Sequence, residues 1–356
     1  MPTWTLSQKT HIFLFDVGRG LSVFIRTPTN HGLIYDMGCR DDFSPADFLA
    51  EYIVPHLDKF GDSRIAQTIL SHPHADHISE VEKLQSGCPL HPHFLTCPHD
   101  RDPAEAVSFD RINNPKGTEA LIASYRSLYQ KRTPPLQSLV YESPLSTPDV
   151  QYGLYYVAPP VVAKLCPSSD QDYANSMSIV FYYRHGKHSI LLPGDITPDI
   201  LQRLLRDAAG VQKRFSHFDR SAQEKHPKWA SVTSDQPRLG QQLGQHGLSV
   251  LVAPHHGLES GYSAALYGSL QRGKPDLVAI SEKRHCSEAD GKVDSRYQSD
   301  TGAAGLTVRV DGIPQPGTRS VTTRNGHHVL VVFQGTGGSP SVFLEKDPVA
   351  LLHLMT

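Results

Sequence analysis

Short runs of apolar and β-branched residues recur along this chain, and most of them end in a turn or a polar cluster. The first three runs, HIFLFDVGRG, LSVFIRT and GLIYDMG, are separated by Gly, Pro and Asn residues and predict an N-terminal β meander whose glycines make a tight hairpin. A segment with helical spacing follows over residues 44–60, where Ser44 suits the N-cap and Pro45 the first helical position. The chain therefore begins as strands and continues into a helix.

The alternation of strand and helix patterns continues beyond residue 60. IAQTIL predicts a buried strand that leads into SHPHADH, and ISEVEKLQSG predicts a helix directly after it. Further helices are predicted near 117–131 and from residue 198. Strand patterns recur in MSIVFYY, HSILLPGD, LSVLVAPHHG, PDLVAIS, LTVRV, SVTT and HHVLVVF, and PVALLHLM is expected to dock as a C-terminal element. Since polar clusters follow strand ends, the sequence predicts an α/β fold.

Composition and charge narrow the class of protein. Hydrophobic residues make up 38% and charged residues 20% of the 356 residues, as in globular proteins. Lys and Arg (34) nearly balance Asp and Glu (36), so the chain lacks the strong positive field of a protein that binds nucleic acid by charge alone. A local basic groove is compatible with this balance, and its candidates are Arg19, Lys187, Arg284, Arg296 and Arg324.

Cysteines and apolar runs indicate the compartment. The five cysteines are scattered without a CxxC pair, which favours reduced thiols. No run approaches the roughly 18 apolar residues that cross a bilayer, and the N-terminus lacks the basic start and long apolar region of a signal peptide. We therefore expect a cytoplasmic protein that does not associate with membranes.

Histidine is clustered in this sequence, most densely in HPHADH at residues 72–77. Residues two apart in an extended segment project to the same side, so His72 and His74 can bind one metal ion together. Asp76 and His77, where the chain bends into the expected helix, point elsewhere and suit a second ion. Two metals roughly 3.5–4 Å apart can hold a bridging hydroxide and stabilise the attacking and leaving oxygens of a hydrolysis. A solvated turn with coincidental histidines is the simpler alternative.

Four ligands cannot complete two coordination shells, so further ligands are expected at distant strand ends. Asp195 in LLPGD and the pair His255 and His256 in APHHG are the candidates, because each follows an apolar strand pattern. Their presence downstream favours metal binding over the coincidental turn.

The cluster HPHADH resembles the HxHxDH signature of the metallo-β-lactamase fold superfamily, and the later GD and HHG fall where its further motifs are expected. FDVGRG, NSMSIVFYY, SILLPGD, PHHG, KPDLVAIS and SVTTRNGHHVLVV run in the same order as in the hydrolase domain of ComEC-like DNA-uptake proteins, over about residues 11–335. The resemblance is to a stand-alone relative without the membrane channel, so transport is not implied. It implies one domain over 1–356 with a four-layer αββα sandwich and helical or irregular insertions at about 85–170 and 198–246.

The resemblance also implies roles for the candidate residues. His72 and His74 would bind the first metal, Asp76 and His77 the second, and Asp195 would bridge them. One of His255 and His256 would complete the second metal, and the other would contact substrate.

Two further positions are implied at the edge of this ligand set. Asp36 in YDMG matches the early aspartate of the superfamily, which supports ligand histidines by hydrogen bonding. Asn175 stands at or next to the place where most members have a third histidine for the first metal, so it is expected to contact metal or substrate. Zn²⁺ is the expected ion, and an oxygen ligand such as Asn175 would favour Mn²⁺.

The function expected from these residues is that of a metal-dependent hydrolase, in which a hydroxide held by two divalent ions attacks the substrate. Asp76 or Asp195 is expected to steer the hydroxide and move a proton, and His256 or His255 to donate to the developing oxyanion. A phosphodiesterase or nuclease acting on DNA or a nucleotide is favoured. The alternatives are a hydrolase of a small phosphodiester or other ester, and a catalytically idle module that binds a partner protein in a bacterial multi-protein system.

Overall fold

The computed structural model describes residues 8–100, 106–112, 118–130, 145–166, 170–206, 238–283, 291–299, 302–335 and 337–355. Arg284, Cys286 and most of the expected insertion at 198–246 lie outside these residues. The four cysteines within them form no disulfide with one another. None of the described helices is both long enough and apolar enough to cross a membrane.

A nine-stranded sheet is built from both ends of the described chain, in the order β12-β11-β15-β14-β1-β2-β3-β4-β5. The expected meander is confirmed, since β1, β2 and β3 pair antiparallel, and β3, β4 and β5 then run parallel. The strands are β1 (Thr10–Leu14), β2 (Ser22–Arg26), β3 (Gly32–Met37), β4 (Ile65–Ile69), β5 (Pro92–Thr96), β11 (Leu306–Val310), β12 (Ile313–Thr318), β14 (His328–Phe333) and β15 (Ser341–Glu345).

A six-stranded sheet has the order β13-β10-β9-β8-β7-β6. The strand patterns MSIVFYY and HSILLPGD form β7 and β8, which pair antiparallel, whereas β8, β9, β10 and β13 run parallel. These strands are β6 (Val150–Tyr155), β7 (Val180–His185), β8 (His188–Leu192), β9 (Val250–Val252), β10 (Leu277–Ile280) and β13 (Ser320–Thr322).

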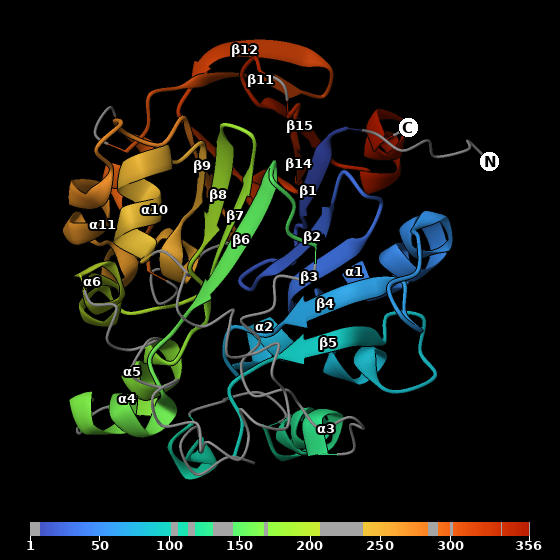
Figure 1. The fold of residues 1–356 in the computed structure, drawn as a ribbon, viewed down its shortest axis with the longest axis vertical. Coiled ribbons are helices and arrows are strands. Elements are labelled where there is room, and N and C mark those ends of the chain that lie inside the picture. The colour runs from blue at the N-terminus through green and yellow to red at the C-terminus, as the bar shows by residue number, and fades with distance from the viewer. Residues whose placement is uncertain are drawn as a thin grey trace.

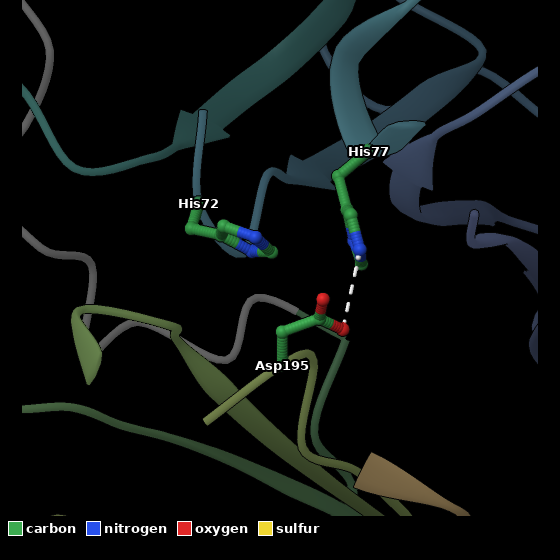
Figure 2. Close-up of side chains that lie close together, drawn as sticks. All are labelled: His72, His77 and Asp195. Carbon is green, nitrogen blue, oxygen red and sulfur yellow. Dashed lines mark ion pairs between the residues drawn. The ribbon is translucent and has the colours of Figure 1, made fainter. Parts of the chain in front are cut away.

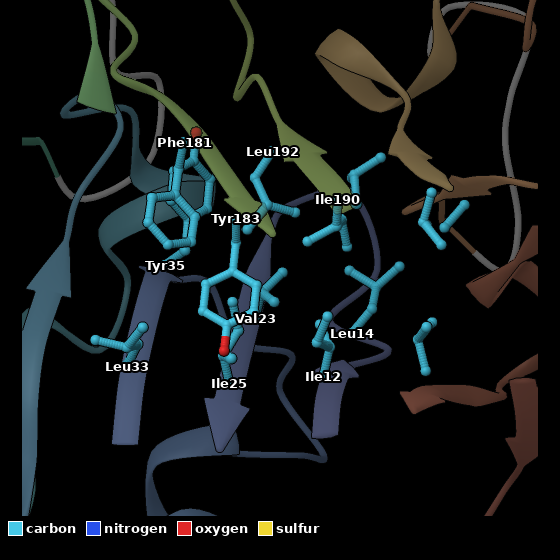
Figure 3. Close-up of a cluster of buried hydrophobic side chains, with 14 of the residues drawn as sticks. Ile12, Leu14, Val23, Ile25, Leu33, Tyr35, Phe181, Tyr183, Ile190 and Leu192 are labelled. Atoms are coloured by element: carbon cyan, nitrogen blue, oxygen red, sulfur yellow. The ribbon is translucent and has the colours of Figure 1, made fainter. Parts of the chain in front are cut away.

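The two sheets pack face to face through a shared apolar core (Figure 3). Side chains alternate along each strand, so Ile12 and Leu14 of β1 point into this core while Phe13 between them points to the outer face. Phe181 and Tyr183 of β7 enter the same core from the other sheet. The alternation fixes the register of both sheets, because a shift by one residue would expose the whole apolar set.

Helices cover the outer face of each sheet (Figure 1). The nine-stranded sheet packs against α1 (Pro45–Phe48), α3 (Thr118–Gln130) and a C-terminal 3₁₀ segment at Pro348–Met355. The six-stranded sheet packs against α6 (Pro198–Arg206), α10 (Leu239–His246) and α11 (Ala264–Ser269). This order of layers confirms the expected α/β fold with an αββα sandwich. The shorter helices are α2 (Ala75–Ile78), α4 (Pro159–Leu165), α5 (Asp170–Ser176) and α12 (Ser295–Gln298).

The prediction of a helix over ISEVEKLQSG is wrong. Only the single turn α2 and a 3₁₀ turn at Val81–Leu84 form there. Glu80 explains the break, because its carboxylate accepts hydrogen bonds from Ser44 Oγ and Ala46 N while its own backbone N–H donates to the Met37 carbonyl. The expected N-cap at Ser44 is confirmed by its bond to the Asp47 N–H, although the helix continues beyond Phe48 only as π and 3₁₀ turns.

The tight hairpin expected from DVGRG is also wrong. The last hydrogen bond between β1 and β2 joins the Phe15 N–H to the Ser22 carbonyl, so a six-residue loop follows instead of a two-residue turn. Gly18 takes a φ of 72° within it. This loop reaches the site described next.

Candidate metal centre

The predicted ligands gather where β3, β4, β8 and β9 end, at one edge of the sandwich. Two backbone hydrogen bonds pin these ends together: Ile179 N–H donates to the Ser71 carbonyl at 3.0 Å, and His255 N–H to the Gly194 carbonyl at 3.1 Å. Figure 2 shows His72 and His77 pointing toward Asp195, which comes from the opposite sheet. The site is therefore built across both sheets.

His77 is the central histidine of the site. Its ring is fully buried, its Nδ1 lies 2.7 Å from Asp36 Oδ2, and its Nε2 lies 3.3 Å from Asp195 Oδ1. Asp36 also accepts bonds from the Ser71 N–H (2.6 Å) and the Ser71 hydroxyl (2.7 Å). A carboxylate that holds Nδ1 in this way fixes the ring and leaves Nε2 to face the space between the sheets. The indirect role predicted for Asp36 agrees with this geometry.

His72 and His74 lie side by side. His72 Nε2 is 3.0 Å from His74 Nδ1, while His72 Nδ1 faces the hydroxyls of Ser71 at 3.0 Å and Ser178 at 3.3 Å. Two imidazole nitrogens that share one tetrahedral zinc ion are about 3.3 Å apart. The spacing therefore suits the shared ion predicted for this pair.

Asp195 faces the histidines of both sheets. Its Oδ2 lies 3.5 Å from His256 Nε2, and the same nitrogen lies 3.5 Å from Asp76 Oδ2. Among the described residues, ligand atoms within 4.8 Å of one another form two groups that could hold a metal ion. The first is His72, His77 and Asp195, and the second is Asp76, His77 and His256. His77 thus belongs to both groups. From the sequence, it was expected to bind the second metal alone.

The donor atoms of these groups fit divalent cations. The Nε2 atoms of His77 and His256 are buried and make no hydrogen bond of good geometry within the described chain, and the same holds for His74 Nε2. Burying an unpaired polar nitrogen destabilises a protein. Imidazole and carboxylate donors left in this state are the ligands that Zn²⁺ uses in proteins.

Electrostatics favours positive charge between the sheets. Burial disfavours protonation of His77, but the carboxylates of Asp195 and Asp36 outweigh it and hold its pKa well above the usual value. The same balance, with Asp195 and Asp76 as partners, raises the pKa of His256 to about 9. Burial alone dominates at His72 and lowers its pKa. The carboxylates thus stabilise a cation at the positions where metal ligands converge.

The geometry distinguishes the two histidines of APHHG. His256 is buried and belongs to the second group, whereas His255 lies at its edge, with Nε2 3.9 Å from Asp195 and Nδ1 bonded to Ser260 at 2.9 Å. Both have left-handed backbones, with φ of 49° and 56°, and Asp36 has φ of 60°. Non-glycine residues pay about 1–3 kcal/mol for such strain, which clusters at functional sites.

Asn175 lies close to the site. It is buried on α5, and its Oδ1 has no hydrogen-bond partner within the described chain. Its carbonyl accepts from the N–H of Ser178, whose hydroxyl faces His72. Asn175 thus lies near the histidines of the first predicted metal, and its contact with metal or substrate stays a prediction.

The residues that support the cluster were not predicted from the sequence. Ser71 joins Asp36 to His72, and the only signal for it is its position directly before the cluster. Gly20 and Gly38 approach the Asp76 carbonyl so closely that a Cβ would lie 2.5 and 2.3 Å from its oxygen. These glycines hold the DVGRG loop and the end of β3 against the turn that carries Asp76.

The described basic residues that were named as groove candidates do not all lie at this end of the fold. Lys187 precedes β8, so it lies at the opposite end of that strand from Asp195. Arg19 is near enough to His255 for its charge to affect that imidazole. Arg296 pairs with Asp294, and Arg324 lies 4.0 Å from Glu282.

Comparisons with known proteins add little to this geometry. No family model and no curated protein matches the chain. Among solved structures, Zn²⁺-bound PqqB from Methylobacterium extorquens is 12% identical over 55% of this chain and 69% of its own, with a TM-score of 0.31. CmlA, a diiron beta-hydroxylase from Streptomyces venezuelae, is 12% identical over 76% of this chain and 44% of its own, with a TM-score of 0.32.

Structures with TM-scores this low are too different to support a conclusion about this chain. The fold and the candidate site are therefore described from this chain's own residues. The ComEC-like resemblance and the single domain over 1–356 stay predictions.

Proposed function

We propose that this chain is a metal-dependent hydrolase of phosphodiesters. The observation that supports the proposal is the pair of overlapping His/Asp groups that share the buried His77. Two divalent cations held there would lower the pKa of a water molecule and neutralise charge on the phosphate oxygens during attack. The ligands in this proposal are His72, His74, Asp76, His77, Asp195 and His256.

Other atoms of the protein would orient the metal ligands and transfer protons during this reaction. Asp36 holds the His77 ring in one orientation through Nδ1. The Asp76 side chain is 36% exposed while Asp195 is buried, so Asp76 is the carboxylate that can pass a proton to solvent. His255, fixed by Ser260 at the edge of the site, is placed to donate a hydrogen bond to charge that develops on the substrate.

Three or more imidazoles with carboxylates suit Zn²⁺, and we propose it as the resident ion, with Mn²⁺ as the alternative. Purified protein should contain close to two ions per chain by mass spectrometry. His256→Ala should lose about one of them, whereas His255→Ala should keep both. Equal loss in the two variants would contradict the assignment of His256 as the ligand.

A hydrolysis assay tests the reaction itself. Metal-loaded protein is incubated with single-stranded DNA, double-stranded DNA and bis-p-nitrophenyl phosphate, beside the His74→Ala/Asp76→Ala variant and a His246→Ala control on the distant helix α10. We expect turnover that the double variant loses and the control keeps.

The other outcomes separate the alternatives. Turnover that the double variant retains would refute the site, and turnover of the small ester alone would exclude a nuclease. Absence of turnover by metal-loaded protein would favour the idle interaction module with a protein partner.

A further inference from the structure

Arg296 and two tyrosines form a layered stack beside the metal centre. The Arg296 guanidinium carbon lies 3.6 Å from the centroid of the Tyr262 ring. The Tyr262 ring in turn stacks on Tyr267, with centroids 5.3 Å apart and planes inclined by 19°. We call the stacked side chains of Arg296 and Tyr262 the Arg296–Tyr262 platform.

The plane of the guanidinium is held in place from its edge. Arg296 Nε donates to Asp294 Oδ1 at 2.9 Å and to Oδ2 at 3.0 Å, and Nη2 also donates to Oδ2. Asp294 itself is fixed because it caps α12 by accepting from the Arg296 N–H at 2.8 Å. The Arg296 side chain remains 46% exposed. The guanidinium is therefore held in one orientation and is partly accessible to solvent.

The platform is attached to the loop that carries His255. The Asp294 N–H donates to the Gly257 carbonyl at 2.8 Å, so α12 is tied to the APHHG turn. Tyr262 follows Gly261, where an added Cβ would lie 2.9 Å from His255 Cβ. Tyr262 is thus next in sequence to a residue in contact with a histidine of the site. A group bound at the metal centre and a group on the platform could belong to one small molecule.

The chemistry of the platform favours a flat ring over a phosphate. Asp294 engages Nε and Nη2 of the guanidinium and pairs with its charge, so Arg296 is less suited to clamp a phosphate than to stack on a flat ring. Arginine planes and tyrosine rings recognise unpaired bases by stacking. The chain's near-zero net charge is also consistent with a substrate that is held by stacking as well as by charge.

We propose that the Arg296–Tyr262 platform stacks the base next to the phosphodiester at the metal centre, so that the substrates are nucleotides or single-stranded nucleic acid. This inference rests on the proposed phosphodiesterase function and narrows its substrate class.

Binding of AMP and ribose 5-phosphate to metal-loaded protein tests the platform without requiring turnover. We expect Arg296→Ala to weaken AMP binding by roughly 5- to 100-fold, the range measured for loss of a base stack. Ribose 5-phosphate should bind equally to both proteins. Arg296→Lys keeps the charge without the flat face, so it should behave like Arg296→Ala, whereas a control, Arg309→Ala on β11, should match the wild type.

Cleavage of a dinucleotide and its abasic counterpart separates this inference from the proposed function. Arg296→Ala should raise KM for the dinucleotide alone, with metal content unchanged. If no phosphodiester is cleaved but AMP binding still depends on Arg296, the proposed function fails and the platform stands. Rescue by Arg296→Lys, equal losses for both ligands, or no loss for either would overturn the platform.

Discussion

Replacing Asp36 by Asn should weaken metal binding while leaving the metal-free fold intact. The Asn carbonyl can accept from the Ser71 N–H as the carboxylate does. Its amide would then face His77 Nδ1, which must become an acceptor. When the imidazole is neutral, its proton therefore lies on Nε2, the atom that faces Asp195 and both ligand groups.

The expected loss of metal affinity follows from the hydrogen bond between residue 36 and His77 Nδ1, whose direction is reversed. Binding a metal through His77 Nε2 would force Nδ1–H against the Asn amide and remove a hydrogen bond to a charged group, which contributes about 1.5–3 kcal/mol. Metal affinity should therefore fall roughly 10- to 100-fold, as for other residues that orient ligand histidines. The metal-free protein should stay folded but lose some stability, because the Asn side chain can still accept from the Ser71 N–H but no longer carries the charge that raises the pKa of His77.

Competition with a fluorescent zinc chelator measures the affinity, and nitrogen chemical shifts of the His77 ring report its tautomer. Asp16→Asn is the matched control, since Asp16 is also a fully buried carboxylate but pairs with Arg40. It should lower stability and leave metal affinity unchanged. An Asp36→Asn protein that binds zinc within threefold of the wild type, or that keeps its proton on Nδ1, would refute the tautomer argument.

Three further predictions concern backbone contact, pH and the core. Gly20→Ala places a Cβ 2.5 Å from the Asp76 carbonyl and should cut kcat/KM roughly 10- to 100-fold, whereas Gly268→Ala, with open space around it, should be neutral in the same assay. Burial lowers the pKa of His11 to about 3, so the unfolded chain takes up the proton first as pH falls below 6.5. About 2 kcal/mol of stability should be lost at this residue between pH 7 and 5, and urea unfolding of His11→Gln with chelator present should lack that portion of the pH dependence. Phe181→Ala should lower the free energy of unfolding by about 3–5 kcal/mol in the same assay, because Phe181 is fully buried between the sheets; a loss below 1 kcal/mol would contradict this packing.

The ends of the strands were predictable from the sequence because their signals are local. Asp195 and His256 each follow an apolar run, and the parallel strands β8 and β9 bring them to one edge of a sheet. Ile12, Phe13 and Leu14 are likewise part of a continuous apolar run, which predicts a strand. These features depend only on neighbours along the chain.

Features that depend on distant contacts were not predictable. The pattern after residue 78 is helical, yet Glu80 leaves the helix to bind Ser44 and Ala46, which lie more than 30 residues earlier. The strands β5 and β6 were missed because their region is rich in Pro and His and has weak periodicity. The sharing of His77 between both groups arises from the approach of two sheets, which no local pattern contains.

The pairing of β1 with β14 has a consequence for how the chain folds during synthesis. Thr10 lies opposite Phe333, so the partners are separated by more than 300 residues. At roughly 5–20 residues per second, one edge of β1 waits tens of seconds at the ribosome for its neighbour. An unpaired apolar edge invites aggregation over that interval. Because β1 is an inner strand of the sheet that also carries β3 and β4, we expect the emerging chain to depend on chaperones until its last strands arrive.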